Sequence, residues 1–187
     1  GRVLCSDERV FRVFATPAQE RVFDFTITFH ANHGELTLGD TKEAAFALRV
    51  AESMRVTKPA DKGKSPEPGA GRLITSEGAM NKDAFGKRAA WCDYSGPVDG
   101  RIVGIAILDH PSNPRHPTWW FVRDYGLHAA NPFGQNAFEN LGNPKAGDLI
   151  VPAGKSITFR YRVYLHEGDE LQAKVAERYA AFAREKK

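Results

Sequence analysis

Cysteine and long apolar segments are both scarce in this chain of 187 residues. The two cysteines, Cys5 and Cys92, lie far apart and have no metal-ligand spacing, so we expect reduced thiols rather than a disulfide framework. No apolar run approaches the roughly 20 residues that cross a bilayer. We therefore expect a soluble protein without a membrane partner.

A signal peptide is also missing, because the chain does not open with basic, apolar and small-residue regions in succession. The first residue is Gly1 rather than Met, which leaves a processed signal or an upstream segment open. Two locations therefore stay open, the cytoplasm and, after processing, a secreted or periplasmic one. The sequence leaves the oligomeric state open as well.

Charge of one sign does not dominate the chain. There are 26 Lys and Arg residues against 23 Asp and Glu residues, and the two kinds are interleaved. Nucleic-acid-binding proteins normally show a basic stripe or a recognisable module. We therefore expect no nucleic-acid partner.

Familiar catalytic motifs are absent too. The sequence has no G-x-S-x-G nucleophile motif, no H-E-x-x-H motif and no glycine-rich loop for phosphate or a dinucleotide. These absences argue against a serine hydrolase, a zinc protease of that type and a nucleotide-dependent enzyme. We expect neither a cofactor nor a resident metal ion, which leaves acid/base chemistry or ligand binding by side chains.

What the chain does contain is alternation of apolar and polar residues with a period of two. Residues 22–30 alternate strictly, with four apolar side chains on one face, and residues 156–166 repeat the pattern. Half-buried antiparallel strands have this pattern. Weaker strand signals cover residues 9–14, 44–51, 72–76, 89–94, 101–109 and 118–123, and Asp99-Gly100 predicts a hairpin turn.

One segment near the C-terminus has a helical period instead. Behind Asp169, a good N-cap residue, apolar residues recur at helical spacing at Leu171, Val175, Tyr179 and Phe182. Residues 57–71 are rich in Pro, Gly and Lys and predict a long exposed loop. We expect residues 1–187 to form a single, mainly β domain, an antiparallel β-sandwich with one C-terminal α-helix.

The densest chemistry lies in residues 107–134, ILDHPSNPRHPTWWFVRDYGLHAANPFG. Prolines follow His110, Asn113, His116 and Asn131 and stiffen the backbone at each of them. A rigid loop at the mouth of a sandwich is a natural binding site. His30 and His166 also end their predicted strands, so both are expected to reach the same rim.

The side chains of this loop suit a polyhydroxylated ligand. Arg and Asn pair with vicinal hydroxyls, and an indole face covers the apolar side of a sugar ring. Adjacent residues on a strand face opposite ways, so only one of Trp119 and Trp120 is expected at the site. Arg123 with Asp124 is either a strand-end ion pair or a ligand contact. The short loop 39–43 is either a turn or the source of an acid/base pair.

Six ordered motifs carry a family resemblance: residues 39–43 (GDTKE), 91–96 (WCDYSG), 109–115 (DHPSNPR), 122–126 (VRDYG), 131–134 (NPFG) and 161–166 (YRVYLH). Together they resemble the bacterial PmoA-like family, often labelled "methane oxygenase PmoA", from about Val22 to Phe182. Family members are typically longer, with further strands upstream. The resemblance therefore implies that this chain corresponds to their C-terminal portion, as a fragment or a processed product.

The resemblance also implies a fold similar to the supersandwich of galactose mutarotase and, by association with sugar-processing enzymes, a carbohydrate ligand. The leading hypothesis is cofactor-independent proton transfer on a sugar, as in a mutarotase or an epimerase. The alternatives are a non-catalytic carbohydrate-binding module and a metal-dependent oxygenase, as the label suggests. Whether the protein is an enzyme stays open.

The sequence nominates two sets of residues for this site, and the expected partner is a small-molecule or oligosaccharide ligand. The acid/base candidates are His110, His30, Glu43 and Asp109. The candidate substrate-binding residues are Asn113, Arg115, His116, Trp119, Arg123, Tyr125, Asn131, Lys42 and His166.

Overall fold

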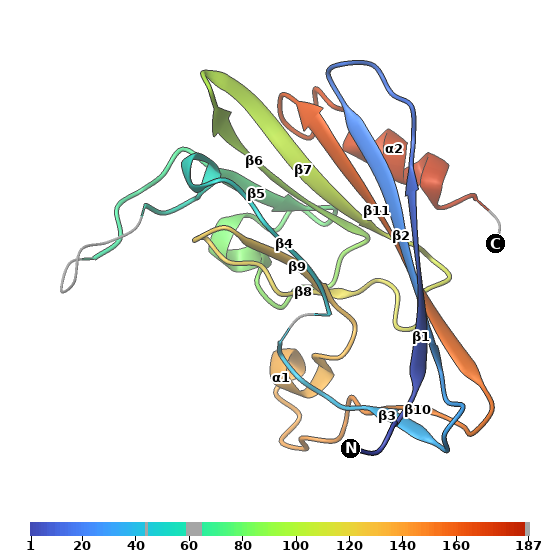
Figure 1. The fold of residues 1–187 in the computed structure, drawn as a ribbon. Helices are drawn as coiled ribbons and strands as arrows, with labels where there is room; N and C mark the ends of the chain where they lie inside the picture. The colour runs from blue at the N-terminus through green and yellow to red at the C-terminus, as the bar shows by residue number, and fades with distance from the viewer. Residues whose placement is uncertain (44, 59–64, 186–187) are drawn as a thin grey trace.

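The computed structural model describes residues 1–43, 45–58 and 65–185, and antiparallel strands dominate it (Figure 1). Strands account for 40% of the structure and helices for 11%. The larger layer is a six-stranded sheet with the order β1–β2–β11–β7–β6–β5. Its strands are β1 (Ser6–Val13), β2 (Arg21–His30), β11 (Ser156–Glu167), β7 (Arg101–Asp109), β6 (Trp91–Val98) and β5 (Arg72–Thr75).

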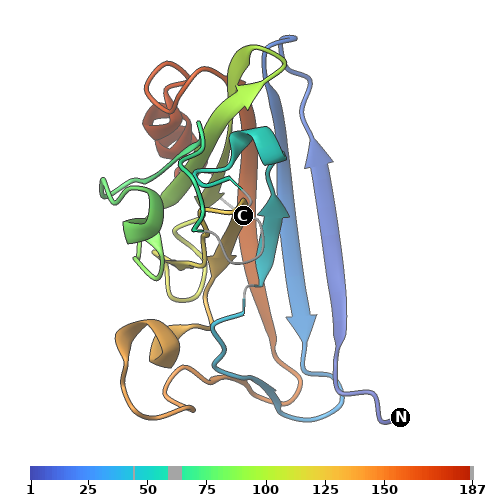
Figure 2. The same cartoon turned by 90° about the vertical axis from the view of Figure 1, so that its left-hand side faces the viewer.

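A smaller layer covers part of this sheet. It consists of a three-stranded sheet, β4 (Phe46–Arg49), β9 (Leu127–Asn131) and β8 (Trp119–Trp120), and a two-stranded sheet, β10 (Leu149–Val151) and β3 (Leu36–Leu38). One cluster of buried residues joins the two layers, including Tyr94 and Ile107 from the large sheet and Trp120 and Ala130 from the small one. In the turned view, β1 and β2 stand at one side of the molecule (Figure 2).

The pairing of β2 with β11 explains how the alternating segments form this core. Phe25 pairs with Tyr161 and Ile27 pairs with Phe159, so the apolar residues of both strands fall on one face of the sheet. The opposite face is covered by α2 (Val175–Phe182), which contributes to a second buried cluster on β6, β7 and β11. The other helical elements are short: α1 (Gln135–Glu139), η1 (Glu52–Met54) and η2 (Asn81–Ala84).

The predicted fold class, mainly β and antiparallel with a C-terminal helix, is confirmed. The two strictly alternating segments and residues 101–109 form strands close to their predicted bounds. The hairpin turn at Asp99-Gly100 is confirmed as well. Both residues have positive φ, 48° and 78°, as a type I′ turn requires.

Three strands and one helix had no sequence signal, namely β3, β9, β10 and α1. Four of the five residues of β9 are buried, so its sequence, LHAAN, shows no polar face to alternate with an apolar one. The strand predicted over residues 118–123 is shorter than expected, because only Trp119 and Trp120 enter the ladder with β9. The predicted segment 44–51 contains β4, and its residue 44 lies outside the described residues.

The C-terminal helix begins later than its apolar spacing predicted. Leu171 precedes α2 and is 76% exposed, so it is not a core residue. Asp169 does act as a cap, but for the turn before the helix: its Oδ1 accepts the backbone N–H groups of Leu171 and Gln172 at 3.1 and 2.9 Å. Lys174, with φ of 55°, then separates this turn from α2.

In the predicted loop 57–71, residues 59–64 lie outside the described residues. The flanking parts run antiparallel, with a bridge between Thr57 and Pro68, and are mostly exposed.

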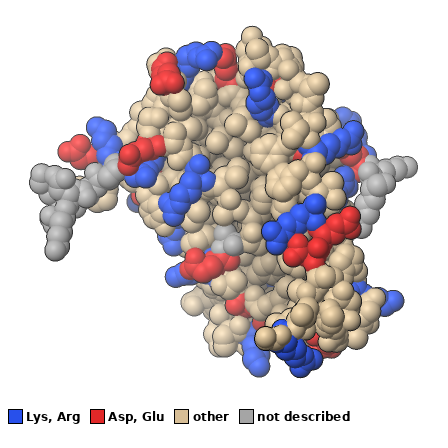
Figure 3. Space-filling view, viewed as in Figure 1, with Lys and Arg blue, Asp and Glu red and all other residues tan. Residues whose placement is uncertain are grey.

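Both cysteines are free thiols. Basic and acidic side chains are interspersed on the face shown in Figure 3. Of the helices in the described ranges, none is long and apolar enough to cross a membrane.

Candidate functional site

His110, the first acid/base candidate, makes structural contacts. Its Nδ1 accepts the backbone N–H of Ser112 at 3.1 Å, and its Nε2 lies 3.1 Å from the carbonyl oxygen of Glu185. The ring meets Phe182 of α2 edge-on, with centroids 4.9 Å apart. Burial and the charge of Arg160 lower the pKa of His110, so a neutral ring attaches the C-terminal helix to the sheet.

Asp109 forms the most developed polar arrangement of the predicted loop. Its buried carboxylate accepts from the Asn113 amide at 2.7 Å and from the Thr118 backbone N–H at 3.0 Å. His116 Nδ1 lies 2.8 Å from the same carboxylate, and His116 Nε2 lies 3.3 Å from the Tyr179 hydroxyl. The carboxylate therefore holds the proton on Nδ1 and leaves Nε2 to accept from Tyr179.

Two other predicted ligand-binding residues hold loops together. Arg115 donates to three backbone carbonyls, those of Pro132, Gly147 and Asp148. Asn131 is fully buried, and its amide donates to the carbonyls of residues 41 and 42 at 2.9 Å each. Donors that are committed to backbone carbonyls are not available to sugar hydroxyls.

The aromatic candidates also differ from the prediction. We expected one of the adjacent tryptophans to line a site, but Trp119 and Trp120 are both buried, and the guanidinium of Arg88 lies 4.5 Å above the Trp119 ring. Arg123 stacks on Phe85 at 3.9 Å. Tyr125 is largely exposed.

The loop 39–43 serves as a turn in the structure. The Asp40 carboxylate accepts the backbone N–H of Asn136 at 2.8 Å, and its own N–H donates to the Asp148 carboxylate at 2.8 Å. Lys42 and Glu43 are exposed. Of the two interpretations of this loop, the geometry favours the turn.

The expectation that His30 and His166 reach one rim is wrong. His30 pairs with Ser156 at the start of β11, whereas His166 lies near the end of that strand. Ten residues of a strand span about 33 Å. Because β2 and β11 are antiparallel neighbours, their C-terminal ends lie at opposite ends of the strand pair.

His166 belongs to a buried pair on the face covered by α2. Its Nε2 lies 2.9 Å from the carboxylate of Asp93, and both side chains are almost completely buried. Burial alone would lower the pKa of His166, but the hydrogen bond and the charge of Asp93 outweigh it and raise that pKa. The pair thus links β11 to β6 and lies apart from the predicted loop.

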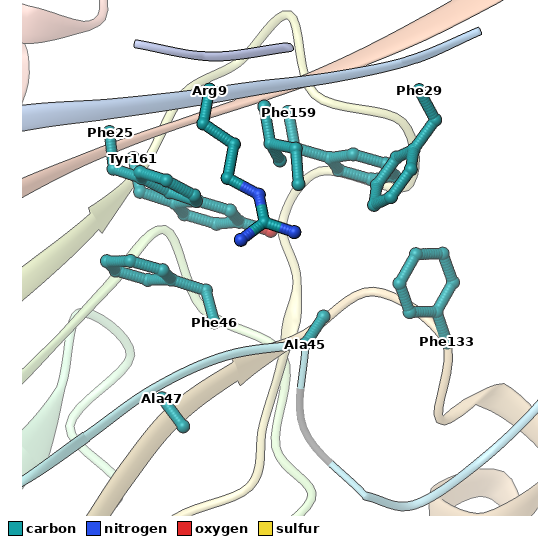
Figure 4. Close-up of a pocket in the computed structure, with 10 residues that line it drawn as sticks. Arg9, Phe25, Phe29, Ala45, Phe46, Ala47, Phe133, Phe159 and Tyr161 are labelled. Atoms are coloured by element: carbon teal, nitrogen blue, oxygen red, sulfur yellow. The ribbon is translucent and has the colours of Figure 1, made fainter. Parts of the chain in front are cut away.

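A cavity of about 370 Å³ opens at a different place, between β1 and β4, which are edge strands of the two layers (Figure 4). Its walls are mainly aromatic. Phe46 stacks on Phe25 and on Tyr161, with centroids 5.1 and 4.9 Å apart, and Phe133 meets Phe159 edge-on at 5.5 Å.

Two residues that carry polar groups line this aromatic cavity, Arg9 and Tyr161. The guanidinium of Arg9 extends into it from β1, and its Nε also contacts the Asp7 carboxylate at 2.7 Å (Figure 4). The hydroxyl of Tyr161 is buried and has no hydrogen-bond partner among the described residues. Burial and the charge of Asp109 raise the pKa of Tyr161 well above 10, so the hydroxyl keeps its proton and stays a donor.

Sequence reasoning missed this cavity, although two signals were present. Tyr161 carries the hydroxyl on the otherwise hydrocarbon face of residues 156–166. Arg9 places a charge on the face of β1 that also bears Phe11 and Val13, because alternate residues share a face. A polar group on an apolar face is therefore the pattern that indicates this site.

The comparisons with known proteins show one match. A model of a family of unknown function, DUF6807, matches residues 1–181. No curated protein and no solved structure matches the chain. In the part of the chain that the structure describes, no three His, Cys, Asp or Glu side chains gather to hold a metal ion. Because the model covers nearly the full length, the chain belongs to the DUF6807 family.

Proposed function

We propose that the cavity between β1 and β4 binds a small, largely apolar molecule that carries one anionic oxygen group, such as an alkyl or aryl carboxylate. The observation that carries this proposal is that Tyr161, whose buried hydroxyl has no partner among the described residues, lines the same cavity as Arg9. A carboxylate oxygen there would accept from the hydroxyl and pair with the guanidinium.

The walls favour an apolar body over a sugar. The cavity volume of about 370 Å³ lies in the range of small-molecule pockets. A sugar carries a hydroxyl on most ring carbons, and each hydroxyl that leaves water needs a new partner. Arg9 and Tyr161 supply too few partners for a sugar, while the aromatic rings supply a large apolar surface.

Isothermal titration calorimetry with octanoate and phenylacetate tests this proposal. We expect saturable binding to the wild-type protein, and binding about tenfold weaker for Arg9→Gln, because that variant loses the charge-assisted hydrogen bond. Tyr161→Phe should also bind about tenfold more weakly. It should fold at least as stably as the wild type, since it removes only a buried, unpaired hydroxyl.

Arg49→Gln is the matched control, because Arg49 is an exposed arginine on β4 that does not line the cavity. Its affinity for both carboxylates should equal that of the wild type. Neutral 1-octanol should bind more weakly than octanoate. Equal affinities in Arg9→Gln and Arg49→Gln, or binding of galactose without binding of either carboxylate, would rule the proposal out.

The hydrogen-bonded series Asp109–His116–Tyr179 favours a second candidate function, proton transfer on a sugar. The carboxylate orients the imidazole so that Nε2 is its basic atom, as a general base requires. The side chain of His116 is 18% exposed, so movement of Tyr179 would open Nε2 to a substrate. The resemblance to the PmoA-like family stays a prediction, and so does the sugar, which was inferred from that resemblance and from the side chains of the 107–134 loop.

NMR measurement of anomer exchange in glucose and galactose tests this second function. We expect exchange faster than in buffer at pH 7 and a return to the buffer rate in His116→Gln. The exposed His33 provides the control, because His33→Gln should leave the rate unchanged. If the wild-type protein exchanges anomers no faster than buffer, His116 serves only to hold α2.

A further inference from the structure

Strand β1 is an edge strand of the six-stranded sheet. It has eight residues, all of them exposed, and within the described ranges it pairs with β2 alone. The opposite edge differs, because β5 has only four residues and its Ile74 forms a β-bridge with Met80. Natural proteins protect long edges with charged side chains, proline or a bulge. The segment SDERVFRV contains no proline, its register with β2 is continuous, and its four charged residues carry both signs, two acidic and two basic.

The free backbone groups of β1 belong to its odd-numbered residues. Phe14 donates its N–H to the carbonyl of Val22 at 3.0 Å, in the same register as the β1–β2 ladder. In an antiparallel pair, alternate residues bond to the neighbour and the others point outward. Asp7, Arg9, Phe11 and Val13 therefore present their N–H and C=O groups to the outside.

The charges of β1 are complementary to those of a second copy of β1 that runs antiparallel to it. Its first half carries Asp7, Glu8 and Arg9, and its second half carries Arg12. With Val10 opposite Val10 of a second copy, Glu8 lies opposite Arg12 of that copy, and the pair occurs twice by symmetry. The outward residues then also face each other, Asp7 to Val13 and Arg9 to Phe11, which permits about eight backbone hydrogen bonds.

Other registers lose this match. A shift of two residues in one direction places Arg9 opposite its own copy, and like charges in directly opposed positions are unfavourable. A shift in the other direction places Arg12 opposite Val10 and forms no ion pair between Glu8 and Arg12. We propose that this protein forms a symmetric dimer through antiparallel β1–β1 pairing centred on Val10, which joins the two large sheets into one.

The dimer would cover an apolar surface beside the cavity. Phe11 and Val13 are 64% and 76% exposed, and they lie on the same face as Arg9. Pairing places Phe11 of the second copy next to Arg9, where it extends the aromatic wall. The dimer does not require a bound ligand, because the edge groups and side chains of β1 form it, and Arg9 is the β1 residue that also lines the cavity.

Sedimentation velocity of the full chain over a range of concentrations tests the dimer. We expect a monomer–dimer equilibrium in the wild type and a dissociation constant at least about tenfold higher in Glu8→Arg or in Arg12→Glu, since each variant opposes like charges twice. The double variant Glu8→Arg/Arg12→Glu restores opposite charges. Its dissociation constant should return to within about threefold of the wild-type value.

Glu77→Arg makes the same charge change on an exposed turn after β5, at the other edge of the sheet, and should leave the dimer intact. Circular dichroism of each variant checks that the sheet is retained. A wild-type monomer at every concentration overturns the proposal. So does a dimer that both single reversals leave unchanged, a double variant that stays monomeric, or growth into open-ended assemblies.

Discussion

Among the histidines of the described residues, His128 is the most deeply buried, and neither ring nitrogen has a hydrogen-bond partner there. It lies between the layers, with its ring 5.9 Å from that of Trp120 and 6.0 Å from that of Tyr94. Burial lowers its pKa from 6.5 to about 3. A protonated imidazole cannot be accommodated at this position without a large loss of solvation.

This histidine should make stability depend on pH. Between pH 6.5 and 3 the unfolded chain binds a proton at His128 that the folded chain does not bind. The stability that neutral His128 permits is therefore complete above pH 6.5 and is lost as the pH falls towards 3, by an amount on the order of 4 kcal/mol.

Urea unfolding of His128→Leu across this pH range provides the measurement. The variant should lose most of this pH dependence and should be as stable as the wild type or more so at pH 7, because a buried polar group without a partner is removed. His33→Gln, at an exposed position, should keep the wild-type profile. Parallel profiles for wild type and His128→Leu would show that other groups cause the acid sensitivity.

The C-terminal helix depends on its buried side chains, Phe182 among them, more than on its own length. With eight residues, α2 is too short to be stable alone in water. Phe182 is buried against the sheet, where the guanidinium of Arg162 lies 4.5 Å from its ring. Arg162 also donates from Nε and Nη2 to the carboxylate of Asp24 and from Nη1 and Nη2 to that of Glu185. These bonds link the end of the helix to β2.

Truncation of this side chain tests how the helix is held. Phe182→Ala should lower the free energy of unfolding by about 3–5 kcal/mol, because it removes a fully buried aromatic ring. Leu171→Ala is the comparison, since Leu171 is exposed and should matter by less than about 0.5 kcal/mol. Urea denaturation followed by circular dichroism measures both. Similar losses in the two variants would mean that the turn before α2, rather than Phe182, holds the helix.

The two layers of the sandwich cover each other incompletely. This mismatch places the proposed ligand cavity and the proposed dimer edge on the same side of the protein. The large sheet has six strands and the facing sheet has three, so the inner faces of β1 and β2 extend beyond their cover. The cavity lies where the cover ends at β4, and the free edge of β1 lies just beyond it. Ligand binding and pairing of two copies therefore use adjacent surfaces without sharing a group other than Arg9.

Local patterns were sufficient for the long strands and for the hairpin turn between β6 and β7. Alternation in residues 22–30 and 156–166 follows from strand geometry, and the Asp99-Gly100 turn follows from the tolerance of these residues for positive φ. The strands β3 and β10 have three residues each, too few for a period to appear. Three of the residues predicted for the site in the 107–134 loop lie together, because Asn113 and His116 both contact Asp109, while their role in binding a ligand stays a prediction.

The amino-acid order thus determined which residues alternate, turn and carry charge, because these properties depend on neighbours along the chain. The order and direction of strands decided which of them meet. Antiparallel pairing of β2 with β11 separates His30 from His166, and it brings Phe25 beside Tyr161, 136 positions away in sequence. Among the described residues, the hydroxyl of Tyr161 without a partner and the strand β1 with a neighbour on one side only are properties of the packed chain, since both are defined by contacts between distant segments.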